Sequence, residues 1–131
     1  MDNEIILVVD DTETMHFMVE AILGGPSRSF EHASDGKEAF EMVKNKQYDL
    51  IISDIHMPKM SGLDLCDKIR MELKFKSLPI LIMTMDTDYH AVEKVFLSGA
   101  TDFIHKPINE LELVSRARRV LEQHKAEKEL N

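Results

Sequence analysis

The chain of 131 residues is poor in cysteine, in positive charge and in long apolar runs. Its single cysteine, Cys66, excludes an intrachain disulfide and is typical of a reducing compartment. Lys and Arg number 16 against 24 Asp and Glu, and the net charge of −8 disfavours direct binding to nucleic acid or an anionic membrane surface. No apolar run approaches the roughly 20 residues of a membrane-spanning helix, and no basic-then-apolar signal precedes Ile5–Val9. These absences predict a soluble, cytoplasmic protein without direct nucleic-acid or membrane partners.

Hydrophobic residues make up 44% of the chain and charged residues 31%, which is enough to bury the core of one ordinary domain. Short apolar runs alternate with longer stretches of helical periodicity. The five runs are Ile5–Val9, Phe30–Ala33, Tyr48–Ser53, Leu78–Met83 and Asp102–His105. Four of them lack a clean polar alternation, as do strands that are covered on both faces of a parallel sheet.

Helical periodicity and helix-capping residues occupy the segments between these runs. We expect helices over Thr12–Leu23, after a cap at Asp35, from Ser61 or Gly62, over Asp88–Leu97, and after a capping box formed by Asn109 and Glu112. The repeated strand–helix order predicts an α/β fold, in which a parallel five-stranded sheet lies between two layers of helices.

The end of the chain has a different composition. Residues after Leu121 favour a helix but are almost wholly polar. We therefore expect one domain over residues 1–122 and a polar extension of the last helix over residues 123–131. A solvated helix end explains this extension, and so does the start of a linker to an output domain.

Polar side chains of complementary chemistry stand where four of the predicted strands end. Asp10 and Asp11 follow the first strand, Asp54 the third, Thr84 the fourth and Lys106 the fifth. Ligands of parallel α/β sheets bind at the carboxyl ends of the strands. Three carboxylates would repel one another unless a divalent cation lay among them, and a hydroxyl and an ammonium group suit a transferring phosphoryl group. A helix cap or a surface charge explains each residue singly, but the conjunction predicts phosphoryl transfer to an aspartate nucleophile.

These residues also carry a resemblance to a known family. The acidic pair, the stretch Asp54-Ile-His-Met-Pro-Lys-Met-Ser-Gly62, Thr84 and Lys106-Pro107 resemble the receiver domain of bacterial two-component response regulators. The resemblance extends from Ile5 to about Leu121. It implies a flavodoxin-like (βα)5 three-layer sandwich with strand order 2-1-3-4-5. It also implies a regulatory phosphoacceptor domain that catalyses only its own phosphorylation and dephosphorylation.

The resemblance implies a role for each acidic residue. Asp54 would accept the phosphoryl group from a sensor histidine kinase or a phosphotransfer protein. Mg²⁺, for which Mn²⁺ could substitute, would be held by the carboxylates of Asp11 and Asp54 and by the backbone carbonyl of His56. Asp10 would act on the ion through water.

The remaining implied roles concern the phosphoryl group and the signal. Thr84 would hydrogen-bond the phosphoryl group, and Lys106 would pair with it. Phe103, three residues before Lys106, occupies the position of the aromatic residue that moves when the family switches; an ordinary core position explains it equally well. Its movement would reshape the face formed by the fourth helix, fifth strand and fifth helix, through which an output domain, a downstream protein or a second copy would be contacted.

Three residues near the site depart from the commonest family pattern. Met85 stands where a small residue is usual, and we hypothesise that it crowds the phosphoryl pocket and slows the access of bulky donors or water. His56 and Asp86 flank the entrance. An ion pair between them could make the phosphate lifetime depend on pH, although independent solvated side chains are the simpler interpretation.

Three other functional classes compete with this interpretation. Haloacid-dehalogenase-like phosphatases place a second Asp two residues after the nucleophile, where this chain has His56. A nucleotide-binding module would need a Gly-rich loop after the first strand, and Asp10-Asp11-Thr12-Glu13 stands there instead. A binding module that no longer responds to phosphate usually loses one of the key residues. All of them are present, but this last alternative stays open.

Overall fold

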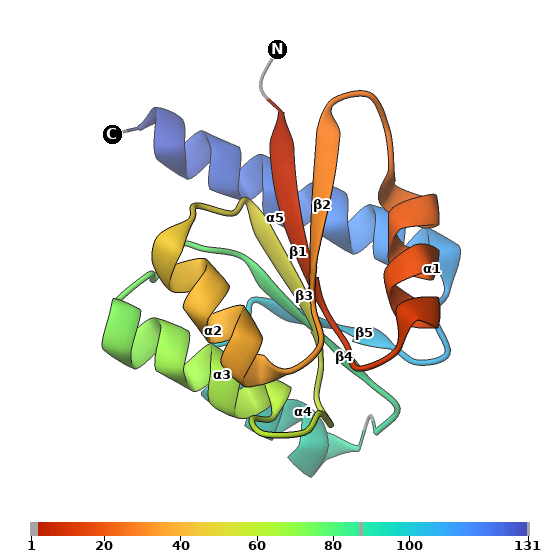
Figure 1. Cartoon of the computed structure of the whole chain (residues 1–131), viewed down its shortest axis with the longest axis vertical. Coiled ribbons are helices and arrows are strands. Elements are labelled where there is room, and N and C mark those ends of the chain that lie inside the picture. Colours follow the sequence, from red (N-terminus) through yellow and green to blue (C-terminus); the bar gives the residue numbers. More distant parts are fainter. Residues whose placement is uncertain (1–2, 87, 131) are drawn as a thin grey trace.

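Five parallel strands form the middle layer of the computed structural model, which describes residues 3–86 and 88–130. The strands are β1 (Glu4–Val9), β2 (Arg28–Ala33), β3 (Leu50–Asp54), β4 (Ile80–Thr84) and β5 (Asp102–His105). Their order in the sheet is β2-β1-β3-β4-β5. Helices cover both faces of this sheet (Figure 1). The predicted α/β, flavodoxin-like sandwich with strand order 2-1-3-4-5 is confirmed.

The helices begin at polar caps. They are α1 (Glu13–Leu23), α2 (Gly36–Asn45), α3 (Gly62–Lys68), α4 (Tyr89–Leu97) and α5 (Glu110–Glu129). The side chains of Thr12, Asp35, Ser61, Asp88 and Asn109 each accept a backbone N–H of the first helical turn. Thr12, predicted as the first residue of its helix, is therefore the cap before it. No described helix is long and apolar enough to cross a membrane.

Two apolar cores lie on opposite faces of the sheet. On one face, α1 and α5 pack against strand residues that include Ile6, Ile52 and Met83. On the other face, α2, α3 and α4 pack against Leu7, Ile51 and their neighbours (Figure 1). Because alternate residues of a strand point to opposite faces, the central strands must be apolar at every position. This explains why β3 and β4 carry continuous runs of apolar residues.

The helix that begins at Gly62 changes its geometry halfway, which the sequence did not predict. Residues Ile69–Leu73 form a π-helical segment, η1, that ends at Lys74 in the left-handed region (φ 61°). Arg70 projects from it and donates to the carbonyl oxygens of Gly99 (2.9 Å) and Phe75 (2.6 Å). Burial lowers the pKa of Arg70. Its side chain ties η1 to the loop that precedes β5.

Candidate functional site

Asp54 ends β3 at the carboxyl edge of the sheet, and only 9% of the residue is exposed. Its two carboxylate oxygens have different partners. Oδ1 accepts the backbone N–H of Ile55 at 2.8 Å. Oδ2 lies 3.3 Å from Nζ of Lys106. The carboxylate is therefore oriented by the chain and paired with a cation.

The loop after Asp54 folds back onto it at Gly62. The N–H of Gly62 donates to the carbonyl oxygen of Ile55 at 2.8 Å. A Cβ atom at Gly62 would lie 2.1 Å from the carbonyl oxygen of Asp54, which is far inside van der Waals contact. Only glycine fits here, and this close approach sets the path of the β3–α3 loop around the site.

Asp10 and Asp11 bring two further carboxylates to the same edge. Asp10 is only 1% exposed, and its Oδ1 accepts the N–H (2.9 Å) and the hydroxyl (2.8 Å) of Thr12. Its Oδ2 is buried and has no hydrogen-bond partner in the described part of the chain; Nζ of Lys106 is 3.9 Å away. One ligand oxygen each from Asp10, Asp11 and Asp54 lies within 4.8 Å of the others. This donor set fits a hard divalent cation, which would also give the buried oxygen of Asp10 a partner.

Lys106 and Thr84 complete the site from the last two strands. The N–H of Lys106 donates to the carbonyl oxygen of Thr84 at 2.9 Å, so the two backbones lie side by side. Thr84 is buried, and its hydroxyl donates to the carbonyl oxygen of Asp86 and accepts the N–H of Asp86, both at 3.0 Å. The chain therefore turns tightly over Thr84–Asp86, and the Thr84 hydroxyl is engaged within this turn.

Met85 lies in the middle of this turn and is 80% exposed. Its predicted effect on access to the phosphoryl pocket stays a prediction. Among the described residues no ion pair joins His56 and Asp86, and both are exposed. Oδ1 of Asp86 instead accepts the N–H of Asp88 at 3.3 Å.

Phe103 is half-buried in β5, between α4 and α5. Its ring meets the rings of Phe96 (6.1 Å between centroids) and His105 (5.4 Å) edge-on. The guanidinium carbon of Arg116 lies 4.9 Å from the Phe103 centroid, and Nη1 of Arg116 donates to the Phe103 carbonyl oxygen. No sequence pattern predicts this contact, because only the docking of α5 brings Arg116 to β5.

Glu112 links this cluster to the strand end beside Lys106. Its carboxylate accepts the N–H of His105 (2.8 Å), lies 2.6 Å from Nδ1 of His105, and lies 3.6 Å from Nη2 of Arg116. Burial tends to raise the pKa of Glu112, but the hydrogen bonds from His105 and the charge of Arg116 prevail and hold it below its usual value. In the predicted capping box, the Asn109 side chain does accept the N–H of Glu112 (2.9 Å). The Glu112 carboxylate, however, accepts the N–H of His105.

Sequence reasoning also missed a pair of histidines behind the acidic pair. A ring nitrogen of His16, Nε2, lies 2.8 Å from the carbonyl oxygen of Asp10. The His16 ring stacks on that of His32 in β2, with centroids 4.5 Å apart and planes within 6°. Two isolated histidines in different elements carry no sequence pattern that would predict this contact, which helps to fix the backbone at Asp10.

The fold and the site together define a doubly wound α/β domain with an acidic pocket and a lysine at the carboxyl edge of its sheet. The chain matches the model of the response regulator receiver domain over residues 6–118. It therefore belongs to the receiver-domain family of two-component response regulators.

Several known proteins are similar to this chain. The DNA-binding transcriptional regulator NtrC of Escherichia coli is 30% identical over 129 residues, which are 98% of this chain and 27% of NtrC. The DNA-binding response regulator MtrA of Mycolicibacterium smegmatis is 34% identical over 122 residues, which are 93% of this chain and 52% of MtrA. This chain thus spans about a quarter to a half of the length of these two curated relatives.

Solved structures show the same fold. The chemotaxis response regulator CheY4 of Vibrio cholerae superposes with a TM-score of 0.83 at 33% identity and covers 90% of this chain and 98% of its own. The signal receiver domain of an HD domain-containing protein from Pseudomonas fluorescens Pf-5 has a TM-score of 0.87 at 26% identity, covering 98% of this chain and 94% of its own.

Proposed function

We propose that this chain is the phosphoacceptor of a two-component phosphorelay and that Asp54 receives the phosphoryl group. The donor would be the phosphohistidine of a sensor histidine kinase or of a phosphotransfer protein. The single observation that carries the proposal is the orientation of the Asp54 carboxylate. One oxygen is tied to the backbone, and the other faces Lys106 beside two further carboxylates.

The transfer follows from these groups. A carboxylate oxygen of Asp54 attacks phosphorus, a P–O bond forms, the P–N bond breaks, and the electron pair returns to the partner's imidazole. The ammonium group of Lys106 pairs with the phosphoryl oxygens, which carry the negative charge during transfer. Thr84 donates its hydroxyl hydrogen to the phosphoryl group in place of the Asp86 carbonyl oxygen.

The donor set fits Mg²⁺ or, in its place, Mn²⁺. Asp11 and Asp54 would hold the ion through their carboxylates, His56 through its backbone carbonyl and Asp10 through water. When bound, the ion offsets the repulsion among the carboxylates and the phosphoryl group. The buried oxygen of Asp10, which lacks a hydrogen-bond partner in the described chain, supports this assignment.

We further propose that phosphorylation is communicated through the face formed by α4, β5 and α5. Phe103 would move inward as Thr84 turns toward the phosphoryl group, and Met85, His56 and Asp86 would border the entrance. The receiver unit would comprise residues 1–122, with residues 123–131 as the polar extension of α5. The face would regulate an output domain, a cytoplasmic partner or a second copy. NtrC and MtrA are named as DNA-binding proteins, and we do not extend that activity to this chain.

Intact-mass measurement after incubation with Mg²⁺ and acetyl phosphate tests the proposal. We expect the wild type to gain the mass of one phosphoryl group and Asp54→Asn to gain none. Asp67→Asn, which removes an exposed carboxylate from α3, is the matched control and should be labelled like the wild type. A chelator should abolish labelling. Equal labelling of wild type and Asp54→Asn, or no labelling of the wild type, would contradict the proposal and favour a binding module that does not respond to phosphate.

A further inference from the structure

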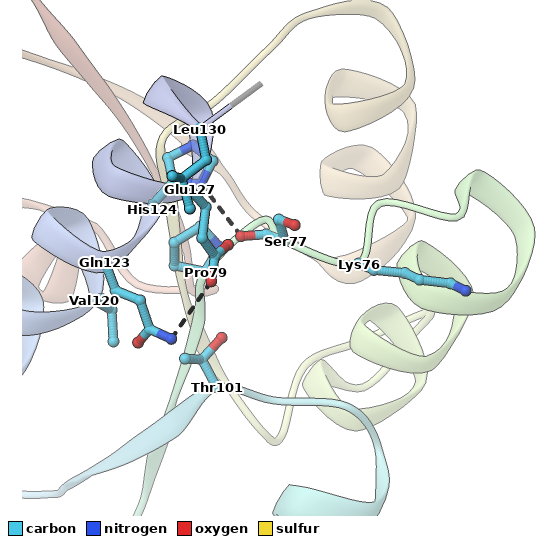
Figure 2. A pocket seen from close by; sticks show the side chains of 9 residues that line it. All are labelled: Lys76, Ser77, Pro79, Thr101, Val120, Gln123, His124, Glu127 and Leu130. Atoms are coloured by element: carbon cyan, nitrogen blue, oxygen red, sulfur yellow. Dashed lines mark hydrogen bonds between the residues drawn. The ribbon is translucent and has the colours of Figure 1, made fainter.

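The two ends of the sheet differ in how closely the connecting segments pack. At the amino-terminal end, a hollow of about 400 Å³ lies between the last turns of α5 and the segment before β4. There Nδ1 of His124 donates to the carbonyl oxygen of Ser77 at 3.2 Å (Figure 2). At the carboxyl end, where Asp54 lies, the β3–α3 loop instead packs directly against the start of α2.

Gly36, the first residue of α2, is buried against this loop. A Cβ atom at residue 36 would lie 2.5 Å from the carbonyl oxygen of Met60 and 2.9 Å from its Cβ atom. Both distances are well inside van der Waals contact. The nearer atom belongs to the backbone, which cannot rotate away as the end of a side chain can. A larger residue at position 36 must therefore displace the loop at Met60 or tilt the start of α2.

The loop makes a tight turn beside Gly36. The N–H of Met60 donates to the carbonyl oxygen of Pro58 at 2.7 Å, and Lys59 between them has a φ of 70°. This backbone is unfavourable for a residue with a side chain and persists only where surrounding contacts hold it. Nζ of Lys59 lies 3.7 Å from Asp35, but the lysine side chain is 67% exposed, so this ion pair contributes little. The packing of Met60 on Gly36 is the stronger restraint.

The same loop carries a proposed ligand of Mg²⁺, the backbone carbonyl of His56. The loop is closed where the N–H of Gly62 donates to the carbonyl oxygen of Ile55 at 2.8 Å. His56 therefore lies between this closure and the support at Met60. A backbone carbonyl has no side-chain torsion that could correct its direction, so the path of the loop alone directs it.

We propose that Gly36 is a positioning residue for Mg²⁺. Because it lacks a side chain, the β3–α3 loop can follow the path that directs the His56 carbonyl toward the ion. This inference rests on the proposed function, in which the acidic pocket binds Mg²⁺. Gly36 is not itself a ligand and acts through its contact with Met60. The start of α2 thereby helps to set the affinity of the site for the ion.

Titration of the full chain with MgCl₂, followed by amide chemical shifts, tests the proposal on folded protein and without a phosphoryl donor. We expect Gly36→Ala to raise the Kd for Mg²⁺ about tenfold, the usual scale for a residue that orients a metal ligand. Gly25→Ala, whose added Cβ meets no atom within 4 Å, should keep the wild-type Kd. In Gly36→Ala the Gly62 amide should also exchange its hydrogen faster, with or without Mg²⁺.

Met60→Ala provides a second test should Gly36→Ala fail to fold. It removes the side chain that packs beside Gly36 and should also raise the Kd for Mg²⁺, by less than Gly36→Ala does. Met42→Ala is the matched control. Met42 and Met60 are both partly buried and pack against the same core, but Met42 belongs to α2 and not to the loop. Its variant should bind Mg²⁺ like the wild type.

Two results would overturn the proposal. One is a Kd for Mg²⁺ that is the same in Gly36→Ala and the wild type. The other, if Gly36→Ala does not fold, is equal Kd values for Met60→Ala and Met42→Ala. A merely structural role lowers the Tm without changing the Kd of folded molecules, so a fall in Tm alone counts against positioning. No binding of Mg²⁺ by the wild type would contradict the proposed function itself, and this inference with it.

Discussion

Single atoms decide the geometry around Asp54, and Gly62 is the sharpest case. We expect Gly62→Ala to destabilise the protein by about 1–3 kcal/mol, because its Cβ atom must displace the backbone that ends β3. The same displacement should reduce phosphorylation by acetyl phosphate. Urea unfolding measures the loss of stability.

Gly25→Ala is the matched control for this prediction. No atom lies within 4 Å of a Cβ atom placed at Gly25, so this variant should unfold within about 1 kcal/mol of the wild type. Equal urea midpoints for Gly62→Ala and Gly25→Ala would contradict the close contact between residue 62 and Asp54.

The sequence could place Asp10, Asp54, Thr84 and Lys106 at one edge because each follows a strand, and parallel strands end together. The direction of a side chain beyond a strand end is harder to predict. Met85 is 80% exposed in a turn that two hydrogen bonds between Thr84 and Asp86 close, and no local sequence pattern predicts that turn. Side-chain contacts between distant elements, such as that of Arg116 with Phe103, depend on packing alone.

At the scale of elements, Glu112 joins α5 to β5. Its pKa is lowered in the folded protein, so it contributes stability above the ordinary glutamate pKa of about 4.3 and loses it as pH falls through the folded value. We expect Glu112→Gln to lower the free energy of unfolding at neutral pH. The difference from the wild type should shrink below about pH 4, which urea unfolding at several pH values would measure.

Glu122→Gln supplies the control on the same helix, because Glu122 is exposed and its side chain forms no hydrogen bond or ion pair with the described residues. Its effect should be small at every pH. A Glu112→Gln variant as stable as Glu122→Gln at neutral pH would show that the contacts of Glu112 with His105 and Arg116 do not hold α5 against β5.

The existence and order of the elements followed from sequence periodicity, but their limits did not. The second strand begins at Arg28, two residues before its predicted start, because Arg28 and Ser29 continue the ladder beside Glu4 and Ile5. Polar residues are tolerated at an edge strand, so apolar content alone underestimates its length. The sequence did not predict the π-helical segment after Lys68, where the Arg70 side chain donates to the carbonyl oxygen of Gly99 in a loop distant in sequence.

At the scale of the whole molecule, three of the 24 acidic side chains, those of Asp10, Asp11 and Asp54, come together at one edge of the sheet. We expect Mg²⁺ to raise the Tm of the wild type; at ten times its Kd, the added stability is about 1.4 kcal/mol, or roughly 4–6 °C. Asp11→Ala should lose most of this rise, because the variant lacks one of the proposed ligands. Differential scanning fluorimetry in MgCl₂, NaCl of equal ionic strength and chelator measures it.

Glu13→Gln removes an exposed negative charge two residues from Asp11 and controls for general screening. It should keep the full response to Mg²⁺. A rise in Tm that is the same in Asp11→Ala and Glu13→Gln would mean that the ion acts on the surface charge of the molecule and is not held by the acidic pocket.

The two oxygens of an isolated aspartate side chain are interchangeable by symmetry. In this protein they are not, since Oδ1 of Asp54 is held by the Ile55 N–H and Oδ2 faces the ammonium group of Lys106. Rotating the carboxylate by half a turn would exchange the positions of its two oxygens, but this rotation must first break both contacts. The fold therefore makes the two oxygens of Asp54 chemically distinct before any reactant binds.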